Sequence, residues 1–312
     1  MTTFTVKRSL ALATLVIGLF CSPLLWAQEK TPDFGAHESI AHLAEEMEHT
    51  WEESPQFFGE LEQKRERFSR AIAFRRGSYI HFARDLEALG EEGFLPMVWA
   101  LVNDNPFALG YDLLTWWNWR LALVEAIGRL EDHRSIPVLV SIIEGNDPHE
   151  RTRRVATMAL GSLLDEPSIE SIIEHARQNQ EHRRAILGGL GTARVDSARI
   201  FLLEHLSENH QGEDRRLAIR SLGDWSNQWA WETSRLANRG GDGMKGRQEI
   251  IAELIHNFSR FSSPEREEAI KSLQLAGSKM SLAYLERFLA EDSHQSENYE
   301  TLHRRLERSP LP

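Results

Sequence analysis

The chain has 312 residues, of which 41% are apolar and 27% are charged, and its formal net charge is −11. This acidic balance argues against a general nucleic-acid-binding protein, because neutralising phosphates requires a basic surface. The single cysteine excludes a disulfide framework within the chain, as well as zinc or iron–sulfur sites built from its own cysteines.

Residues 1–27 have the pattern of an export signal. Lys7 and Arg8 precede an apolar stretch at 9–20, and the segment ends in a signal-peptidase site at Ala27. We therefore expect a Sec-type signal peptide and a periplasmic or secreted mature protein. Cleavage would also remove the only cysteine, which suits an oxidising compartment.

The alternative is that residues 1–27 stay attached and anchor the protein in the inner membrane. The mostly apolar stretch at 9–27 is close to the length that spans a bilayer. Pro23 interrupts this stretch and favours cleavage. No second apolar segment of that length follows, so we expect no other contact with the membrane.

Residues 28–75 are predicted to form an acidic helical cap. Acids predominate at the start of this segment, and Phe57, Phe58 and Leu61 recur at helical spacing. We expect one or two helices that cover the end of the array that follows, preceded by a disordered start.

An internal repeat dominates residues 76–291. Each copy has an arginine that is followed eight positions later by a glycine, and successive glycines are 30 to 33 residues apart. The four best copies contain Arg120 and Gly128, Arg153 and Gly161, Arg183 and Gly191, and Arg215 and Gly223. A fifth copy keeps the spacing and the arginine, Arg247, but has Ile255 in place of the glycine.

Each copy is predicted to form a pair of helices. Leu121, Val124 and Ile127 recur at helical spacing before a glycine, and Ile169 and Ile172 do so after the turn of the next copy. Small residues two positions before each glycine would let neighbouring helices approach closely. No segment alternates with a period of two, so we predict an all-α fold.

The consensus R-x-x-A-x-x-A-L-G-x-L-x-D-x-x-x-I-P-x-L resembles the HEAT-like repeat first described in phycobilisome lyases. Residues 120–139 match it closely, with Ala126, Gly128, Asp132 and Pro137 in place. The resemblance extends over about 80–260 with decreasing fidelity. It implies a right-handed α-solenoid, and because such arrays mostly serve as scaffolds, it also implies binding to another protein.

The repeat arginines would stack as a ladder across neighbouring helices. One interpretation is a cationic stripe that binds an acidic partner. The resemblance implies instead that each arginine pairs with an acid in the adjacent turn, and Asp132, Asp165 and Asp196 stand near the required positions. We favour this structural role.

Two groups of tryptophans occur in the repeats. Alignment of the copies places Trp117, Trp225 and Trp231 in the core, whereas Trp116, Trp119 and Trp229 fall off the buried stripe. Exposed tryptophans on such an array would form a binding hot spot for a protein, or a stacking platform for cell-wall glycan. The alternative is that they pack beneath the insert at 103–118.

No pattern supports catalysis or a bound cofactor. His175 and His205 share a register and each follows a glutamate, but no third histidine joins them, so we expect a solvated helix face and no metal site. The segment 241–246 fits G-x-G-x-x-G but follows a predicted helix instead of the strand that a dinucleotide site needs. The resembled family also includes lyases that handle a chromophore, a role that fits an exported chain poorly.

The C-terminal region is predicted to contain further helices at 264–276 and 279–291, followed by a polar tail at 292–312. Whether 264–291 forms a full repeat or a capping pair stays open. Our hypothesis from the sequence is an exported, non-catalytic scaffold without a metal. We expect it to bind another protein through the surface of the second helices and the tryptophan-bearing insert.

Overall fold

The computed structural model describes residues 38–74, 80–105, 109–145, 149–206, 212–233, 243–291 and 296–310. Within these ranges every regular element is helical and there is no strand, which confirms the all-α prediction. The expected signal segment at 1–27 lies outside the described residues. None of the described helices combines the length and apolar character needed to cross a membrane.

The described elements are all helical segments. In chain order they are η2 (Glu38–Leu43), α1 (Ala44–Glu53), α2 (Gln56–Phe74), α3 (Ile80–Glu87), η3 (Glu91–Gly93), α4 (Phe94–Asn103), α6 (Leu113–Leu130), η4 (His133–Ser135), α7 (Ile136–Glu144), α8 (Glu150–Leu163), α9 (Glu166–Gln178), α10 (Gln180–Gly189), η5 (Leu190–Thr192), α11 (Asp196–Glu204), α12 (Glu213–Trp225), α13 (Gln228–Trp231), α15 (Met244–Asn257), η6 (Phe258–Arg260), α16 (Ser263–Glu291) and α17 (Ser296–Glu307).

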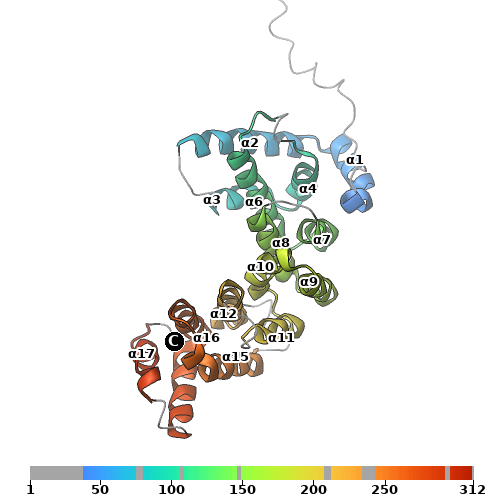
Figure 1. Ribbon diagram of the computed structural model, residues 1–312. Coiled ribbons are helices and arrows are strands. Elements are labelled where there is room, and N and C mark those ends of the chain that lie inside the picture. The colour runs from blue at the N-terminus through green and yellow to red at the C-terminus, as the bar shows by residue number, and fades with distance from the viewer. Residues whose placement is uncertain are drawn as a thin grey trace, which may run out of the picture. The chain divides into compact units, whose positions relative to one another are not determined.

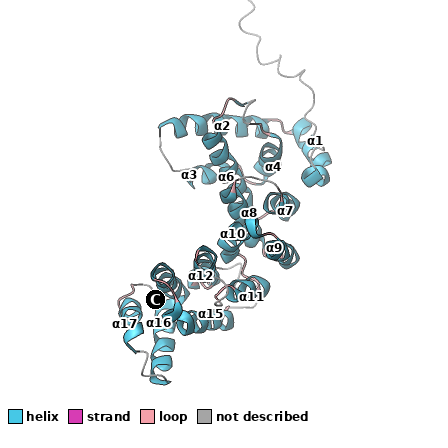
Figure 2. Cartoon of the chain, viewed as in Figure 1, coloured by secondary structure: helices cyan, strands magenta, loops and turns pink. Residues whose placement is uncertain are grey.

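The repeat helices lie in two rows (Figure 1). The first row contains α6, α8, α10, α12 and α16, and each of these helices packs against the next. The second row contains α7, α9, α11 and α15, which follow one another in the same way (Figure 2). The two rows share one contiguous hydrophobic core, in which Leu123, Leu160, Ile186 and Leu222 are fully buried.

The repeat glycines lie where one first-row helix contacts the next. A Cβ atom on Gly128 would fall 2.5 Å from the Cβ of Ala159, and one on Gly223 would fall 2.7 Å from the Cα of Ser272. Any side chain at these positions would therefore push the helices apart. Ala159, two positions before Gly161, confirms the prediction that small residues in that register allow close approach.

The turns between paired helices also repeat. Glu131 and Leu164, at equivalent positions in consecutive copies, end α6 and α8 in the left-handed conformation, with φ of 55° and 57°. Asp132 and Asp165 follow directly, and their carboxylates accept hydrogen bonds from the backbone N–H groups of Arg134 and Ser168. The left-handed residue ends one helix and the aspartate caps the start of the next.

The fifth predicted copy does not occupy the expected place. We predicted that Arg247 belongs to a first helix, but α15, which carries it, lies in the second row beside α11. The reason is that α13 has only four residues and is too short to act as a second helix, so α15 takes that place. Ser272 of α16, and no residue of α15, faces Gly223. The predicted helix at 264–276 is therefore the next first-row helix, and it is broken from the rest of α16 at Gly277, whose φ is 121°.

The C-terminal region also differs from the prediction. Within the expected polar tail at 292–312, residues 296–307 form α17, which packs against α16. Tyr299, Leu302 and Leu306 are buried, and the Tyr299 hydroxyl donates to the Ile255 carbonyl at 2.9 Å. These apolar residues share one helical face, a pattern that the high polarity of the segment conceals.

The described part of the predicted N-terminal cap, residues 38–74, forms η2, α1 and α2. The helix η2 packs on α7, while α2 packs on α3, α4 and α6. Phe68 of α2 is buried against Phe82 of α3 and Trp119 of α6, with ring centroids 4.9 and 5.3 Å away. This segment therefore covers the start of the first row.

Candidate functional site

The repeat arginines have a structural role, but their partners differ from the predicted acids. Arg153 donates to the carbonyls of Ile143 and Gly145 at 2.9 and 3.0 Å, at the end of α7. Arg183 does the same at the end of α9, where it donates to the Ala176 carbonyl at 3.1 Å. A cation at a helix C-terminus satisfies carbonyls that have no partner within the helix.

Of the other three ladder arginines, two also donate to backbone carbonyls and one forms an ion pair. Arg120 donates to the Leu101 carbonyl near the end of α4, at 2.7 Å. Arg247 donates to the Ala276 carbonyl of α16 at 2.6 Å. Arg215 instead forms a buried ion pair with Glu265 of α16.

The three acids that we expected to face this ladder have other partners. Asp132 and Asp165 cap the helices that follow them, as described above, and Asp132 also pairs with Arg134. Asp196 pairs with Arg199 on its own helix, at 3.0 Å. The predicted pairing is therefore wrong, because each acid is used by the backbone or by an arginine in its own copy.

Two of the three candidate binding tryptophans are buried. Trp119 has no exposed surface, and its indole Nε1 donates to Asp104 at 3.2 Å. Trp116 is 6% exposed and lies beneath the Arg120 guanidinium, 5.5 Å from its ring centroid. The prediction of a surface role for this pair is wrong, because α2, α3 and α4 cover the sides of α6 that the repeat pattern leaves open.

The remaining tryptophans divide between core and surface. Trp225 is buried, as predicted, and Trp231 packs against it with ring centroids 4.9 Å apart. Trp117 is half-buried and stacks on His149. Trp229 is 43% exposed, as expected for a surface residue. A platform that combines Trp229 with Trp116 and Trp119 does not form.

The histidines do not assemble a metal site. His205 is buried and its ring bonds to the Phe201 carbonyl, so the expectation of a solvated position is wrong for it. The ring Nε2 of His175 lies 2.8 Å from the ring Nδ1 of His182, a histidine that is not in the register of His175 and His205. Across the described ranges, no cluster of three or more histidine, cysteine, aspartate or glutamate side chains is placed to hold an ion.

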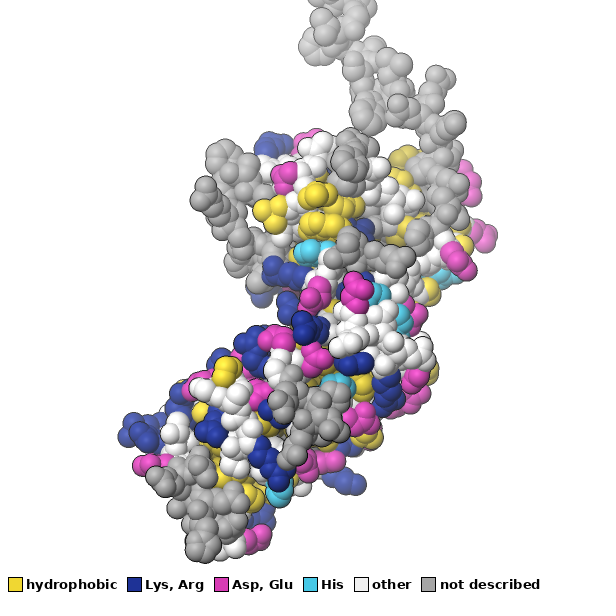
Figure 3. All heavy atoms as spheres, in the orientation of Figure 1, with side chains coloured by type: hydrophobic (Ala, Val, Ile, Leu, Met, Phe, Trp, Pro, Cys, Tyr) yellow, Lys and Arg dark blue, Asp and Glu magenta, His cyan; other side chains and the backbone are white. Residues whose placement is uncertain are grey.

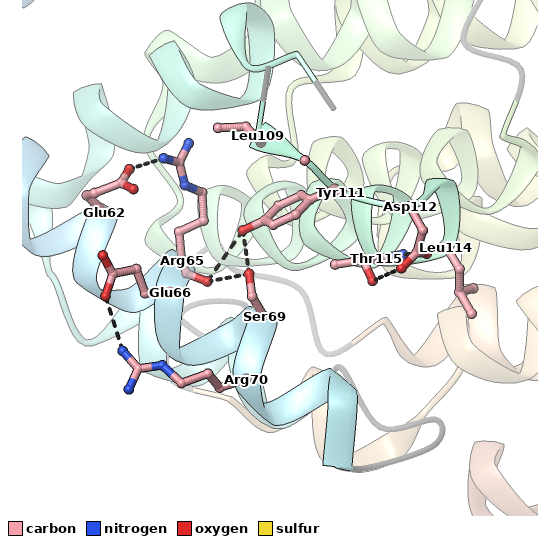
Figure 4. A pocket seen from close by; sticks show the side chains of 11 residues that line it. Glu62, Arg65, Glu66, Ser69, Arg70, Leu109, Tyr111, Asp112, Leu114 and Thr115 are labelled. Atoms are coloured by element: carbon pink, nitrogen blue, oxygen red, sulfur yellow. Dashed lines mark hydrogen bonds and ion pairs between the residues drawn. The ribbon is translucent and has the colours of Figure 1, made fainter. Parts of the chain in front are cut away.

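A hollow of about 690 Å³ lies between α2 and the start of α6 (Figure 4). Ser69 Oγ donates to the Tyr111 hydroxyl at 2.6 Å, and this hydroxyl donates to the Arg65 carbonyl at 3.5 Å. Four of the charged side chains that line the hollow form the pairs Glu62–Arg65 and Glu66–Arg70, and the fifth, Asp112, accepts a hydrogen bond from the Thr115 hydroxyl at 2.8 Å. Tyr111 thus ties α2 to the segment just before α6, and the hollow presents no charged group that lacks a partner.

A second hollow runs along the first row of helices, and we call it the first-row groove. Its volume is about 680 Å³ and its walls come from five helices: α3, α6, α8, α10 and α12. The lining side chains include Glu87, Glu125, Arg129, Arg151, Arg154, Val155, Met158, Arg220 and Asp224. The sequence hypothesis placed the binding surface on the second helices, whereas this groove is formed by the first helices.

The groove runs along one position of the repeat, which holds a different residue in each copy. Five positions after the ladder arginine, successive copies have Glu125, Met158, Gly188 and Arg220. Met158 is 41% exposed, and the stem of Arg154 lies against Gly188, with its Cδ 2.8 Å from where a Cβ atom on the glycine would fall. This row of unlike residues crosses four helices and places an exposed methionine between charged residues at the two ends of the groove.

The charges at the two ends of the groove are largely paired. Arg129 bonds to Glu125 at 2.9 Å and to Glu87 at 3.4 Å. Arg220 bonds to Glu268 of α16 at 2.7 Å. Burial raises the pKa of Asp224, although Arg194 and Arg220 act to lower it.

The middle of the groove is different. Arg154 makes no hydrogen bond or ion pair with any described residue, and its Cδ lies against Gly188. Burial and the charge of Arg154 together lower the pKa of Arg151. Figure 3 shows basic side chains interleaved with acids in this middle part of the chain. The groove thus combines an exposed methionine with two neighbouring arginines.

No family model matches the chain, and no curated protein matches it. The likeness to HEAT-like repeats therefore stays a prediction from the sequence pattern. The groove and its neighbouring surfaces are the basis for inferring a function.

Proposed function

We propose that the protein is an exported, non-catalytic scaffold that binds another protein through the first-row groove. In this proposal the two rows of helices form a right-handed α-solenoid of HEAT-like pairs. The observation that carries the proposal is the groove itself, because residues from five helices line one hollow. Stacked repeats characteristically offer extended binding surfaces of this kind.

The character of the groove favours a polypeptide partner. Met158 is 41% exposed at its centre, and methionine is an adaptable contact residue at protein-binding surfaces. Val155 lies beside it, half-buried. Apolar centres surrounded by polar groups are typical of protein interfaces.

The second row offers a weaker case. Ile200 of α11 is 49% exposed, but it is a single apolar residue, which is normal on a soluble surface. The tryptophans that motivated a glycan-binding alternative do not form a platform, since only Trp229 is exposed among the three. We therefore place the binding surface on the first row.

Affinity purification from native cells tests this proposal. The tagged wild-type chain is compared with Met158→Asp in the groove and with Ile200→Asp in the second row. We expect a stoichiometric partner that is retained by the wild type and by Ile200→Asp but lost from Met158→Asp. A partner that is lost only from Ile200→Asp, or the absence of any specific partner, would contradict the proposal.

A further inference from the structure

The strongest feature that the proposed function leaves unexplained is the pair of arginines on α8. Arg151 and Arg154 are three residues apart on one helix, so their side chains project from the same face. Arg151 is exposed, and Arg154 is half-buried with its stem over Gly188. Two like charges therefore lie next to each other on the wall of the groove.

The acids that line the groove do not neutralise Arg154. Glu87 and Glu125 bind Arg129, Asp224 faces Arg194 and Arg220, and the fourth acid, Glu131, forms no ion pair with Arg154. The first-row arginines in the same register as Arg154 differ from it, because Arg184 binds Asp214 at 2.9 Å and Arg216 binds Glu213 at 2.9 Å. Arg154 is thus the member of this row whose guanidinium is available to a ligand.

An apolar contact stands next to this charge. Met158 follows Arg154 by four residues and lies on the same face of α8, with Val155 beside it. Gly188 of α10, where the other copies have a side chain, accommodates the stem of Arg154: a Cβ atom there would fall 2.8 Å from the Arg154 Cδ. A ligand that reaches Arg154 would therefore also contact Met158.

We propose that the α8 part of the groove binds a segment of a partner protein that presents a carboxylate to Arg154 and an adjacent aliphatic side chain to Met158. This inference rests on the proposed function and names the chemistry of its partner. A planar guanidinium suits a carboxylate because it donates two parallel hydrogen bonds. The apolar neighbour buries the methionine and excludes water from the ion pair.

The overall charge of the chain limits how acidic this segment is. With a net charge of −11, the protein repels a strongly acidic partner at distances within the Debye length. Arg154 acts at contact distance, so it selects a single carboxylate in a mostly apolar segment. A long acidic tract would be disfavoured.

Selection from a phage-displayed library of random dodecapeptides tests the inference. The full chain is the target, and the affinity of selected peptides is measured by fluorescence polarisation. We expect selected peptides to contain aspartate or glutamate next to an aliphatic residue. Arg154→Gln should weaken their binding about tenfold, since one charge-assisted hydrogen-bonded contact is lost.

The matched control is Arg177→Gln in the second row, which removes one positive charge from an arginine paired with Glu204. It should leave the affinity unchanged. Because Arg154 has no partner among the described residues, Arg154→Gln should unfold at the temperature of the wild type, which circular dichroism checks. Equal loss of affinity in both variants would mean a general charge effect and would overturn the inference.

The outcomes separate this inference from the proposed function. Selected peptides could lack acidic residues and bind Arg154→Gln as tightly as the wild type, but not bind Met158→Asp. That result would overturn the proposed carboxylate contact and leave the groove as a binding site. If no selected peptide depends on either residue, both proposals fail. Concentration-dependent dimerisation that Met158→Asp abolishes would identify a second copy as the occupant and would also overturn the inference.

Discussion

Arg215 and Glu265 form a buried two-point ion pair that joins α12 to α16. Arg215 Nε donates to Oε1 at 2.7 Å and Nη2 donates to Oε2 at 2.9 Å. The backbone N–H of Ser262 donates to the same carboxylate at 2.7 Å. Burial acts to raise the pKa of Glu265, but the hydrogen bonds from Arg215 and Ser262 outweigh it and lower this pKa to about 2.

Removing the carboxylate of this pair should strongly destabilise the protein. Glu265→Ala leaves the Arg215 charge buried without a partner, so we expect a loss of about 3–5 kcal/mol in the free energy of unfolding. Urea denaturation monitored by circular dichroism measures it. Glu204→Ala, which breaks the exposed pair with Arg177, should change stability by less than about 1 kcal/mol. Similar losses in the two variants would show that the buried pair has no special role.

The low pKa of Glu265 also predicts an acid limit to stability. A carboxyl group whose pKa is lower in the folded than in the unfolded chain stabilises the fold above its unfolded pKa of 4.5. This contribution is lost as the pH falls from 4.5 towards about 2. Denaturation curves across this pH range should therefore show that the free energy of unfolding falls more steeply in the wild type than in Glu265→Gln. Parallel pH profiles would be inconsistent with the depressed pKa.

Asp104 should produce the opposite dependence. Its carboxylate is buried between Arg65 and Trp119, and burial raises its pKa from 3.8 to about 6 despite these two neighbours. The folded protein then holds the proton more tightly than the unfolded chain, so stability falls as the pH rises from 3.8 to about 6, by about 3 kcal/mol. Asp104→Asn should remove this dependence of stability on pH. An unchanged dependence in the variant would show that Asp104 is not its source.

The close contact at Gly223 predicts a steric effect. Gly223→Ala places a Cβ atom 2.7 Å from the Cα of Ser272, so the helices must separate, and we expect a loss of about 1–3 kcal/mol. Gly59→Ala in α2 is the control, because nothing lies within 4 Å of its added Cβ. It should stabilise the protein by about 0.5–1 kcal/mol. Thermal unfolding should show a lower melting temperature for Gly223→Ala and a higher one for Gly59→Ala. A higher melting temperature for both variants would contradict the close contact.

Replacing a tryptophan should reduce stability according to how deeply its ring is buried. Trp119→Ala removes a fully buried ring and is expected to cost about 3–5 kcal/mol. Trp229→Ala removes a ring that is 43% exposed and should change the free energy of unfolding by less than about 1 kcal/mol. Chemical denaturation compares them directly. Equal effects would show that the two residues have similar environments.

Local patterns in the sequence predicted much of the fold. Helical spacing indicated the helices, and the glycine register located the close contacts such as Gly128 with Ala159. The structural role of the arginine ladder was also predicted. The partners were not, because Arg153 binds backbone carbonyls, which every residue has and no sequence pattern marks.

The errors arose where distant segments determine the environment. Trp119 lies off the buried stripe of its own repeat, but Phe68 and Phe82 cover it from helices outside that repeat. Arg247 keeps the repeat spacing, although the short α13 moves its helix into the second row. The groove was missed because Met158 and Gly188 share a register without sharing a residue type. Comparing the copies position by position would have revealed that row.

The central claim is that the first-row groove contacts another protein, and site-specific photo-crosslinking in native cells tests it most directly. The photoreactive amino acid p-benzoylphenylalanine replaces Met158 in one variant and Ile200 in another. We predict a discrete adduct with one other protein from position 158 and none from position 200. No adduct at position 158, or the same adduct from both positions, would contradict the proposal.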